Sequence, residues 1–177
     1  MIIAIIGRIR SGKSTVRQLI QKEAKQYNVD LEHIRFADPI YNEVEEFYKR
    51  WNIPYRKFRP LFDAIGEALA EHGDNDKVQE VFENKINLNN DLIIDDARRL
   101  TQARFLEKYD TAFIRVVSNT DTRKIRCAEG EWTDNHVSDI ELNSYPEDYI
   151  INNDGTLEEL KAAVKDVCKK IFSIIKS

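Results

Sequence analysis

The stretch Gly7-Arg8-Ile9-Arg10-Ser11-Gly12-Lys13-Ser14 directly follows the apolar run Ile2 to Ile6 and opens a helix-like segment, 13–27. Its spacing, G-x-x-x-x-G-K-S, is that of a phosphate-binding loop, or P-loop. The two glycines let the backbone bend around an anion, and the following helix offers its positive N-terminal end. Because strand, loop and helix come in the order that this motif requires, the sequence predicts a site for a nucleoside triphosphate such as ATP.

Each part of this loop has an expected role. Lys13 would reach the β- and γ-phosphates with its charge, and the Ser14 hydroxyl would be a ligand of Mg²⁺. The residues expected to bind ATP here are Gly7, Arg10, Ser11, Gly12, Lys13, Ser14 and Thr15. The structural alternative is a glycine-rich turn without a ligand.

The composition narrows the class of protein. With 177 residues and 42% hydrophobic content, the chain suits one well-buried core and predicts a single domain, 1–177. Lys and Arg number 27 against 31 Asp and Glu, so the net charge of −4 argues against a nucleic-acid partner. Cys127 and Cys168 have no His or Cys at metal-ligand spacing and are typical of reduced thiols. No apolar segment approaches a membrane span. We therefore expect a cytoplasmic protein with small-molecule partners and no membrane association.

Short apolar runs alternate with longer amphipathic segments, which is the pattern of βαβ units in a parallel sheet. We expect strands at Ile2–Ile6, His33–Ala37, Leu92–Asp95, Ala112–Ser118 and Tyr149–Asn152. We expect helices at Lys13–Tyr27, Pro39–Trp51, Pro60–Glu71, Asp76–Asn87, Arg98–Tyr109 and Thr156–Ile175. The long gap at about 38–90 would be a helical insertion beside the carboxyl edge of the sheet, where ligands of open α/β sheets bind.

The third expected strand closes on carboxylates, in Leu92-Ile93-Ile94-Asp95-Asp96. This is the pattern of a Walker B segment, whose carboxylate holds a water of the Mg²⁺ shell or orients the P-loop Ser14. Asp95 is the first candidate because it follows the apolar run without a break. The alternative is that both aspartates start the next loop or cap its helix, and capping fits Asp96 well.

Arginines follow two of the expected strands. Arg98 and Arg99 would open a helix, where a cation opposes the helix dipole, and the planar fork of Arg98 is suited to gripping an acceptor phosphate. Arg123 and Arg126 stand three apart on one face of a possible helix. In a lid at about 119–137 they would neutralise the transferring group and exclude water. The alternatives are a solvated helix-face arginine for Arg98 or Arg99 and a charged exposed turn for Arg123 and Arg126.

Several further motifs occur in a fixed order after the P-loop. They are Phe36-Ala37-Asp38-Pro39, Arg59-Pro60-Leu61-Phe62-Asp63-Ala64-Ile65-Gly66, Asp95-Asp96-Ala97-Arg98, His136-Val137-Ser138-Asp139 and Ile150-Ile151-Asn152-Asn153-Asp154-Gly155-Thr156-Leu157. Together with the loop, they resemble the phage-type deoxynucleoside monophosphate kinases over nearly the whole chain. Dephospho-coenzyme A kinases have the same layout.

This resemblance implies a P-loop α/β/α fold with a five-stranded parallel sheet in the order 2-3-1-4-5, an acceptor-binding insertion and a lid. It implies Mg²⁺-dependent transfer of the γ-phosphoryl group of ATP to a (deoxy)nucleoside 5′-monophosphate, and it leaves a homodimer open. The residues it assigns are Asp38 for the acceptor sugar or base, Arg59 and Arg98 for the acceptor phosphate, Arg123 and Arg126 for the transferred group, and Asn153, Asp154 and Gly155 for the border of the adenine. Gln102, also assigned to the acceptor, stands where the family often has Glu, so the preferred base stays open.

Some of these positions also fit purely local roles. Asp38 before Pro39 fits a helix N-cap with proline at the first helical position. Thr156 to Glu159 and Ser138 to Glu141 have the spacing of capping boxes, so we expect His136 to be a loop or lid residue rather than a catalytic base.

Two other activities are weighed against the monophosphate kinase. A phosphate acceptor needs alignment and charge neutralisation, whereas the hydroxyl acceptor of a dephospho-coenzyme A, shikimate or nucleoside kinase needs a carboxylate to take its proton, for which Asp38 is the candidate. A nucleotide switch is the minor alternative. Asp63-Ala64-Ile65-Gly66 matches the D-x-x-G spacing of GTPases, but it lies in a helical stretch and the sequence has no Asn-Lys-x-Asp segment.

Overall fold

The computed structural model of the chain describes residues 1–56, 58–71, 75–86, 90–127 and 141–173. The chain divides into two compact units, Met1–His33 with Leu88–Ser177 and Ile34–Asn87. The first unit contains the sheet, and the described elements of the second unit are helices. The second unit covers most of the segment for which the sequence predicts a helical insertion.

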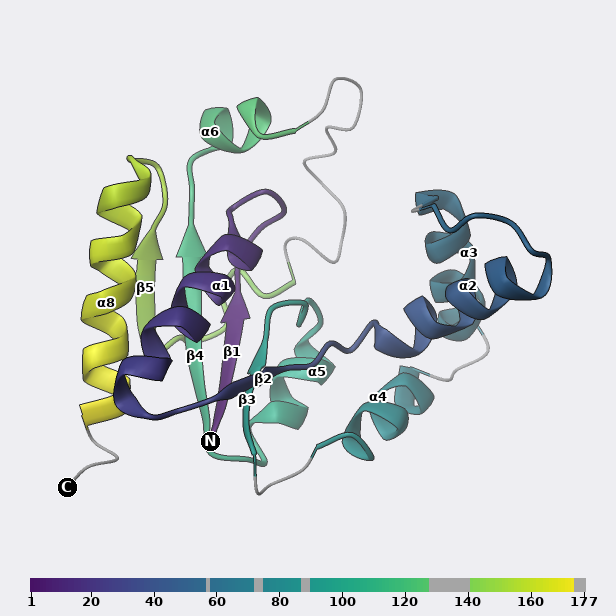
Figure 1. Cartoon of the computed structure of the whole chain (residues 1–177), viewed down its shortest axis with the longest axis horizontal. Coiled ribbons are helices and arrows are strands. Elements are labelled where there is room, and N and C mark those ends of the chain that lie inside the picture. The colour runs from purple at the N-terminus through teal and green to yellow at the C-terminus, as the bar shows by residue number, and fades with distance from the viewer. Residues whose placement is uncertain (57, 72–74, 87–89, 128–140, 174–177) are drawn as a thin grey trace. The chain divides into compact units, whose positions relative to one another are not determined.

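Five parallel strands form the sheet of the first unit (Figure 1). They are β1 (Ile2–Ile6), β2 (Leu31–His33), β3 (Asp91–Ile94), β4 (Thr111–Val117) and β5 (Tyr149–Asn152), in the order β2-β3-β1-β4-β5. β1 lies between β3 and β4, with Ile3 opposite Ile93 and Ile5 opposite Ile114. The predicted α/β fold, its parallel sheet and its strand order are confirmed.

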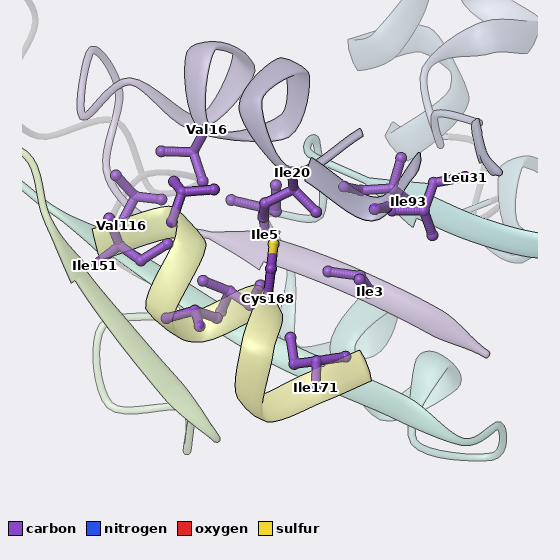
Figure 2. Packing of buried hydrophobic residues seen from close by; sticks show 14 of the residues in the cluster. Ile3, Ile5, Val16, Ile20, Leu31, Ile93, Val116, Ile151, Cys168 and Ile171 are labelled. Carbon is purple, nitrogen blue, oxygen red and sulfur yellow. The ribbon is translucent and has the colours of Figure 1, made fainter. Parts of the chain in front are cut away.

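The described helices of this unit are α1 (Lys13–Ala24), α5 (Leu100–Leu106), α6 (Thr120–Ile125) and α8 (Leu157–Ser173), with a 3-10 turn η1 (Lys25–Tyr27) after α1. Buried residues recur at helical spacing in α1 and α8, so each helix has one apolar face. These residues are Val16, Ile20 and Ala24 in α1 and Leu160, Val164, Val167, Cys168, Ile171 and Phe172 in α8. All of them belong to one cluster with Ile3 and Ile5, and Figure 2 shows Val16, Ile20, Cys168 and Ile171 among its members. No helix in the described ranges is both long and apolar enough to cross a membrane.

The opposite face of β1 is covered as well. Successive side chains of a strand point to opposite faces, yet Ile2, Ala4 and Ile6 are as buried as Ile3 and Ile5. Ala103, Phe105 and Leu106 of α5 are also buried. This two-sided burial explains why β1 is uniformly apolar, as central strands of parallel sheets are.

In its described residues the second unit has three helices, α2 (Asp38–Arg50), α3 (Arg59–Glu71) and α4 (Asn75–Glu83), and α2 contacts both of the others. Its interior is aromatic. The rings of Phe36 and Phe82 stack with centroids 3.9 Å apart, and those of Tyr41 and Phe62 are 4.7 Å apart. All three helices expected between the second and third strands are therefore present.

The strand expected at His33–Ala37 is wrong, because β2 ends at His33. A turn follows, in which the Asp38 carboxylate accepts hydrogen bonds from the backbone N (3.0 Å) and Nε (2.7 Å) of Arg35. Asp38 N in turn donates to Arg35 O. As a result Ala37 is the N-cap of α2 and Asp38 is the first residue of the helix. The interpretation of Asp38 as the N-cap is therefore wrong by one residue.

The helix expected at Arg98–Tyr109 is shorter than predicted. Arg99 is the N-cap of α5, and Gln102 Oε1 accepts hydrogen bonds from the backbone N of Arg98 (2.9 Å) and Arg99 (3.2 Å). Asp96 therefore does not cap this helix. The other elements begin and end within a few residues of their predicted positions.

Cys127 and Cys168 are both free, as the sequence predicts. Burial, helped by the charge of Glu23, raises the pKa of the Cys168 thiol to about 12. This thiol is part of the core between α1 and α8.

The predicted capping box at the start of α8 is confirmed. Thr156 N donates to Glu159 Oε2 (2.7 Å), and Glu159 N donates to Thr156 Oγ1 (3.3 Å). The hydrogen bond from the Thr156 backbone, together with that from its hydroxyl, lowers the pKa of the Glu159 carboxyl.

We predict that Thr156→Ala lowers the free energy of unfolding by about 1 kcal/mol, because it removes the acceptor for the first helical N–H groups. Urea unfolding followed by circular dichroism measures the change. Thr156→Ser keeps the hydroxyl and serves as the control with stability near that of the unmutated chain. Equal stability of the alanine variant would show that this cap contributes nothing.

Candidate active site

The loop between β1 and α1 has a backbone conformation that glycine favours. The φ angles of Gly7, Arg10 and Gly12 are 144°, 60° and 99°. A Cβ atom at Gly7 would lie 2.4 Å from Val116 O, and one at Gly12 would lie 2.1 Å from Asn153 Nδ2. Both glycines of the motif are therefore required by space as well as by backbone conformation.

Helix α1 begins directly after this loop. Gly12 is its N-cap and supplies no side-chain cap, and its first turn contains no acidic residue. The first N–H groups of a helix have no partners within the helix, and its dipole favours an anion there. The side chains of Ser14 and Thr15, in the same turn, are exposed. The helix start thus has the features of an anion site.

Lys13 adds a positive charge to the loop. Its Nζ donates to the carbonyl oxygens of Gly7 (2.7 Å) and Arg8 (3.0 Å). The amine therefore lies at the loop itself, where the lysine of a P-loop is expected to meet phosphate.

Three side chains from other elements surround the Ser11 carbonyl. Asn153 Nδ2 donates to it at 2.8 Å, Arg126 Nη1 donates at 3.4 Å, and the Ser118 hydroxyl is 3.2 Å away. Arg126 Nη2 also donates to Asn153 O at 2.8 Å. The loop is thereby tied to the carboxyl ends of β4 and β5 and to α6, which lie at one edge of the sheet (Figure 1).

The residues after β5 form a turn beside this network. Asp154 Oδ1 accepts a hydrogen bond from Asn119 N (2.8 Å), and Asn119 Oδ1 caps α6 by accepting from Thr122 N (2.8 Å). Asn153 is buried, whereas Asp154 and Gly155 are exposed. Their assignment to the border of an adenine stays a prediction.

Asp95 lies at the end of β3 and is bound on both carboxylate oxygens. Oδ2 accepts from Arg17 Nε of α1 (3.1 Å), and Oδ1 is 2.8 Å from His33 Nε2 of β2. Burial alone would raise the pKa of Asp95, but the hydrogen bonds and charges of His33 and Arg17 hold it below its ordinary value. The carboxylate is therefore an anion that links three elements of the first unit.

The donor groups suit a Mg²⁺ ion that arrives with a triphosphate. In the described ranges no three His, Cys, Asp or Glu side chains gather as a metal cluster. Mg²⁺ commonly keeps several waters and binds through one or two protein groups plus phosphates. The exposed Ser14 hydroxyl fits a direct ligand, whereas Asp95, already paired with Arg17 and His33, fits contact through water.

The candidate arginines of the first unit differ in their surroundings. Arg98 is partly exposed just before α5, next to the backbone N–H groups that Gln102 caps. Arg123 of α6 is buried, with Nη2 3.2 Å from Thr120 Oγ1, so the exposed-turn interpretation is wrong for this residue. Arg126 is exposed and contacts the P-loop as described above.

Other predicted positions belong to the second unit or lie outside the description. Asp38 begins α2, with its Oδ2 3.8 Å from Lys85 Nζ. Arg59 begins α3, and its side chain lies outside the described set. The remainder of the predicted lid, 128–137, with His136, and most of the capping box expected at Ser138 lie outside the described residues.

Sequence reasoning gave no role to Arg17, His33 or Ser118. Arg17 lies one helical turn after Ser14, and His33 and Ser118 lie at or just after the carboxyl ends of β2 and β4. These positions in the sequence could have marked the three residues as candidates. Their hydrogen-bond partners could not be predicted, because they come from distant segments of the chain.

Solved structures have a similar fold. The chain is similar to a shikimate kinase from Aquifex aeolicus, with 17% identity, coverage of 100% of this chain and 99% of the other, and a TM-score of 0.57. It is similar to a gluconokinase from Sinorhizobium meliloti (15% identity, 98% and 94% coverage, TM-score 0.53). It is also similar to a shikimate kinase from Acinetobacter baumannii (13% identity, 98% and 92% coverage, TM-score 0.53).

At these identities the similarity establishes the fold, which is that of the P-loop kinases. Neither a family model nor a curated protein matches the sequence. The comparisons therefore show the fold, and the activity and its acceptor are matters for proposal.

We predict that Asp95→Asn lowers the free energy of unfolding by about 3 kcal/mol, because Arg17 then keeps a half-buried charge without its anion. Asp91→Asn, at the other end of β3, is the matched control. Its carboxylate pairs with the N-terminal amine and is 37% exposed, so we expect a loss of about 1 kcal/mol or less. Urea unfolding without nucleotide measures both, and equal losses would contradict a structural role for the Asp95 pair.

Proposed function

We propose that the chain transfers the γ-phosphoryl group of ATP to a (deoxy)nucleoside 5′-monophosphate. The observation that carries this proposal is the loop at 7–14, which has positive φ angles at Gly7, Arg10 and Gly12, a Lys13 amine hydrogen-bonded to the loop carbonyls and a following helix start that no side chain caps. The kinase fold supports phosphoryl transfer. The ordered motifs that resemble phage-type deoxynucleoside monophosphate kinases support the choice of acceptor.

The residues of the chain would act by alignment and charge neutralisation. The loop N–H groups and Lys13 bind the β- and γ-phosphates, and Arg98 and Arg59 bind the acceptor phosphate. An acceptor phosphate oxygen forms a bond to the γ-phosphorus while the bond from that phosphorus to the β,γ-bridging oxygen breaks, giving ADP and a diphosphate. A phosphate acceptor is already anionic, so no side chain has to remove a proton.

A Mg²⁺ ion bound with the triphosphate would supply neutralisation of phosphate charge. Ser14 would hold it directly and Asp95 through water. Arg126 would neutralise the transferred group only after leaving its contacts with the carbonyls of Ser11 and Asn153.

A hydroxyl acceptor is the second candidate. The similar structures are named for shikimate and gluconate, so the fold does not decide the acceptor. In that reaction Asp38 would have to take a proton, yet its carboxylate already accepts from Arg35 and lies near Lys85. Those contacts favour the phosphate acceptor.

The nucleotide switch remains the minor alternative. The segment Asp63-Ala64-Ile65-Gly66 lies inside α3, whereas the D-x-x-G of a GTPase switch follows a strand. A switch would hydrolyse nucleotide without regard to added monophosphate, so the dependence of ADP release on the acceptor separates the two classes.

We predict that Lys13→Ala lowers phosphoryl transfer by about a hundredfold or more, because the phosphates lose a positive charge at the loop. A coupled ADP-release assay across deoxynucleoside and ribonucleoside monophosphates, with dephospho-coenzyme A included, measures it. Lys165→Ala, on an exposed position of α8, controls for loss of a surface lysine. Transfer near the unmutated rate in a folded Lys13→Ala protein would contradict the proposal.

We predict that Asp38→Asn changes turnover by less than about fivefold, because a phosphate acceptor needs no general base. If the acceptor is a hydroxyl, the same variant loses about a hundredfold or more in kcat. The assay uses the best acceptor from the panel, with circular dichroism confirming the fold. A large loss of kcat would contradict a monophosphate acceptor and support a hydroxyl acceptor.

A further inference from the structure

We propose that Asn153 is a positioning residue for the P-loop: its side-chain amide fixes the peptide between Ser11 and Gly12, and so the direction in which the loop presents its N–H groups to phosphate. This inference rests on the proposed binding of a polyphosphate at the loop. It differs from the family resemblance, which assigns Asn153 to the border of the adenine.

The first step is the geometry of the peptide itself. The described chain contains no cis peptide bond, so the Ser11 carbonyl and the Gly12 N–H lie in one plane and point in opposite directions. Asn153 Nδ2 donates to the Ser11 carbonyl at 2.8 Å. Holding this oxygen toward the end of β5 therefore directs the Gly12 N–H away from β5.

The hydrogen bond between the Asn153 amide and the Ser11 carbonyl is buried. Ser11 is 0% exposed and Asn153 is 6% exposed. Because water has little access to the bond between them, the amide is not readily replaced when it is removed, and the carbonyl loses a partner. The Ser11 carbonyl would then keep only the longer contacts with the Ser118 hydroxyl (3.2 Å) and Arg126 Nη1 (3.4 Å). The peptide would be held less firmly, and a rotation of its carbonyl toward the space where anionic oxygens bind would be electrostatically unfavourable for the ligand.

The Asn153 amide occupies the space that a side chain at Gly12 would need. A Cβ atom there would lie 2.1 Å from Asn153 Nδ2, far inside contact distance. The second glycine of the motif therefore makes room for this amide in addition to adopting a left-handed φ. The P-loop glycine and the asparagine after β5 fit each other as a pair.

Asn153 is itself held firmly. Its backbone N donates to Val117 O at 2.8 Å. Its carbonyl accepts from Arg126 Nη2 and lies within hydrogen-bond distance of the Ser118 hydroxyl, both at 2.8 Å. The amide is thus a fixed support carried by the ends of β4 and β5, which is what a positioning role requires.

The two roles for Asn153 make different predictions about ligands. A residue that contacts only the adenine affects nucleotides and leaves inorganic polyphosphates unaffected. A residue that fixes the loop affects any ligand of the loop, with or without a base. Mg-tripolyphosphate and Mg-ATP are therefore the two probes.

The experiment is calorimetric titration of the unmutated chain, Asn153→Ala and Asn152→Ala with each probe. We expect Asn153→Ala to weaken both ligands by the same factor, about tenfold. In turnover it should raise the KM for ATP by about that factor and leave the KM for the acceptor unchanged. Asn152 is the exposed neighbour, and its alanine variant should bind both probes like the unmutated chain.

Weakened ATP binding with unchanged tripolyphosphate binding would overturn the inference in favour of the adenine contact. Unchanged binding of both probes would also overturn it. If Asn153→Ala does not fold, Ser118→Ala removes one hydroxyl from the same support and should give a smaller but equal weakening of both probes. Unequal or absent weakening in a folded Ser118→Ala protein counts against the inference.

The outcomes also separate this inference from the proposed function. If the unmutated chain binds both probes but phosphorylates no monophosphate, the proposed acceptor is wrong while the role of Asn153 is still measured. If it phosphorylates a monophosphate and Asn153→Ala changes nothing, only the role of Asn153 is wrong. If it binds neither probe, both proposals fail.

Discussion

The close approach of the P-loop to the ends of β4 and β5 is the constraint on which the rest of the site depends. Gly7 lies against the carbonyl of Val116, and Gly12 lies against the amide of Asn153, in each case with no space for a Cβ atom. The loop can pass there only because β1 is central in the sheet, between β3 and β4. The apolar sequence of β1 and the glycines after it are therefore both needed for the loop to pass close to the ends of β4 and β5.

Charged side chains on the β3 side of β1 hold α1, the helix that follows the P-loop, in place. Arg17 of α1 binds Asp95 after β3, and His33 of β2 lies against the same carboxylate. Arg17 Nη1 also donates to Gln21 Oε1, and Gln21 Nε2 donates to Leu31 O. These contacts, together with the apolar face of α1, fix the helix whose N-terminus is the proposed anion site. Rigid support of this kind is what electrostatic catalysis of phosphoryl transfer requires.

Local patterns predicted the elements whose signals are local. The apolar runs gave β1 and β5 at their observed bounds, and the capping box gave the start of α8. The second strand was misplaced because Arg35 and Asp38 form a turn where the pattern is still apolar. The resemblance assigns Gln102 to the acceptor, which stays a prediction, and it could not show that the Gln102 carbonyl oxygen caps the backbone before α5.

Contacts between distant segments of the chain could not be predicted from the sequence. Asp95 meets residues 78 and 62 positions away, and Asn153 meets one 142 positions away. No period or motif encodes such pairs, so the sequence could name Asp95 and Asn153 as candidate site residues without giving their partners. The burial of Arg123 was missed for the same reason, since a run of charges is usually solvated.

In the proposed function, the bend after β1 binds the phosphate tail of a magnesium nucleotide. Isothermal titration of the unmutated chain with Mg-ATP, beside Mg²⁺ with adenosine, distinguishes such a site from a bend without a ligand. We expect saturable binding of ATP to one site per chain and no comparable binding of adenosine. Equal affinity for both, or no heat with ATP at millimolar concentration, would contradict it.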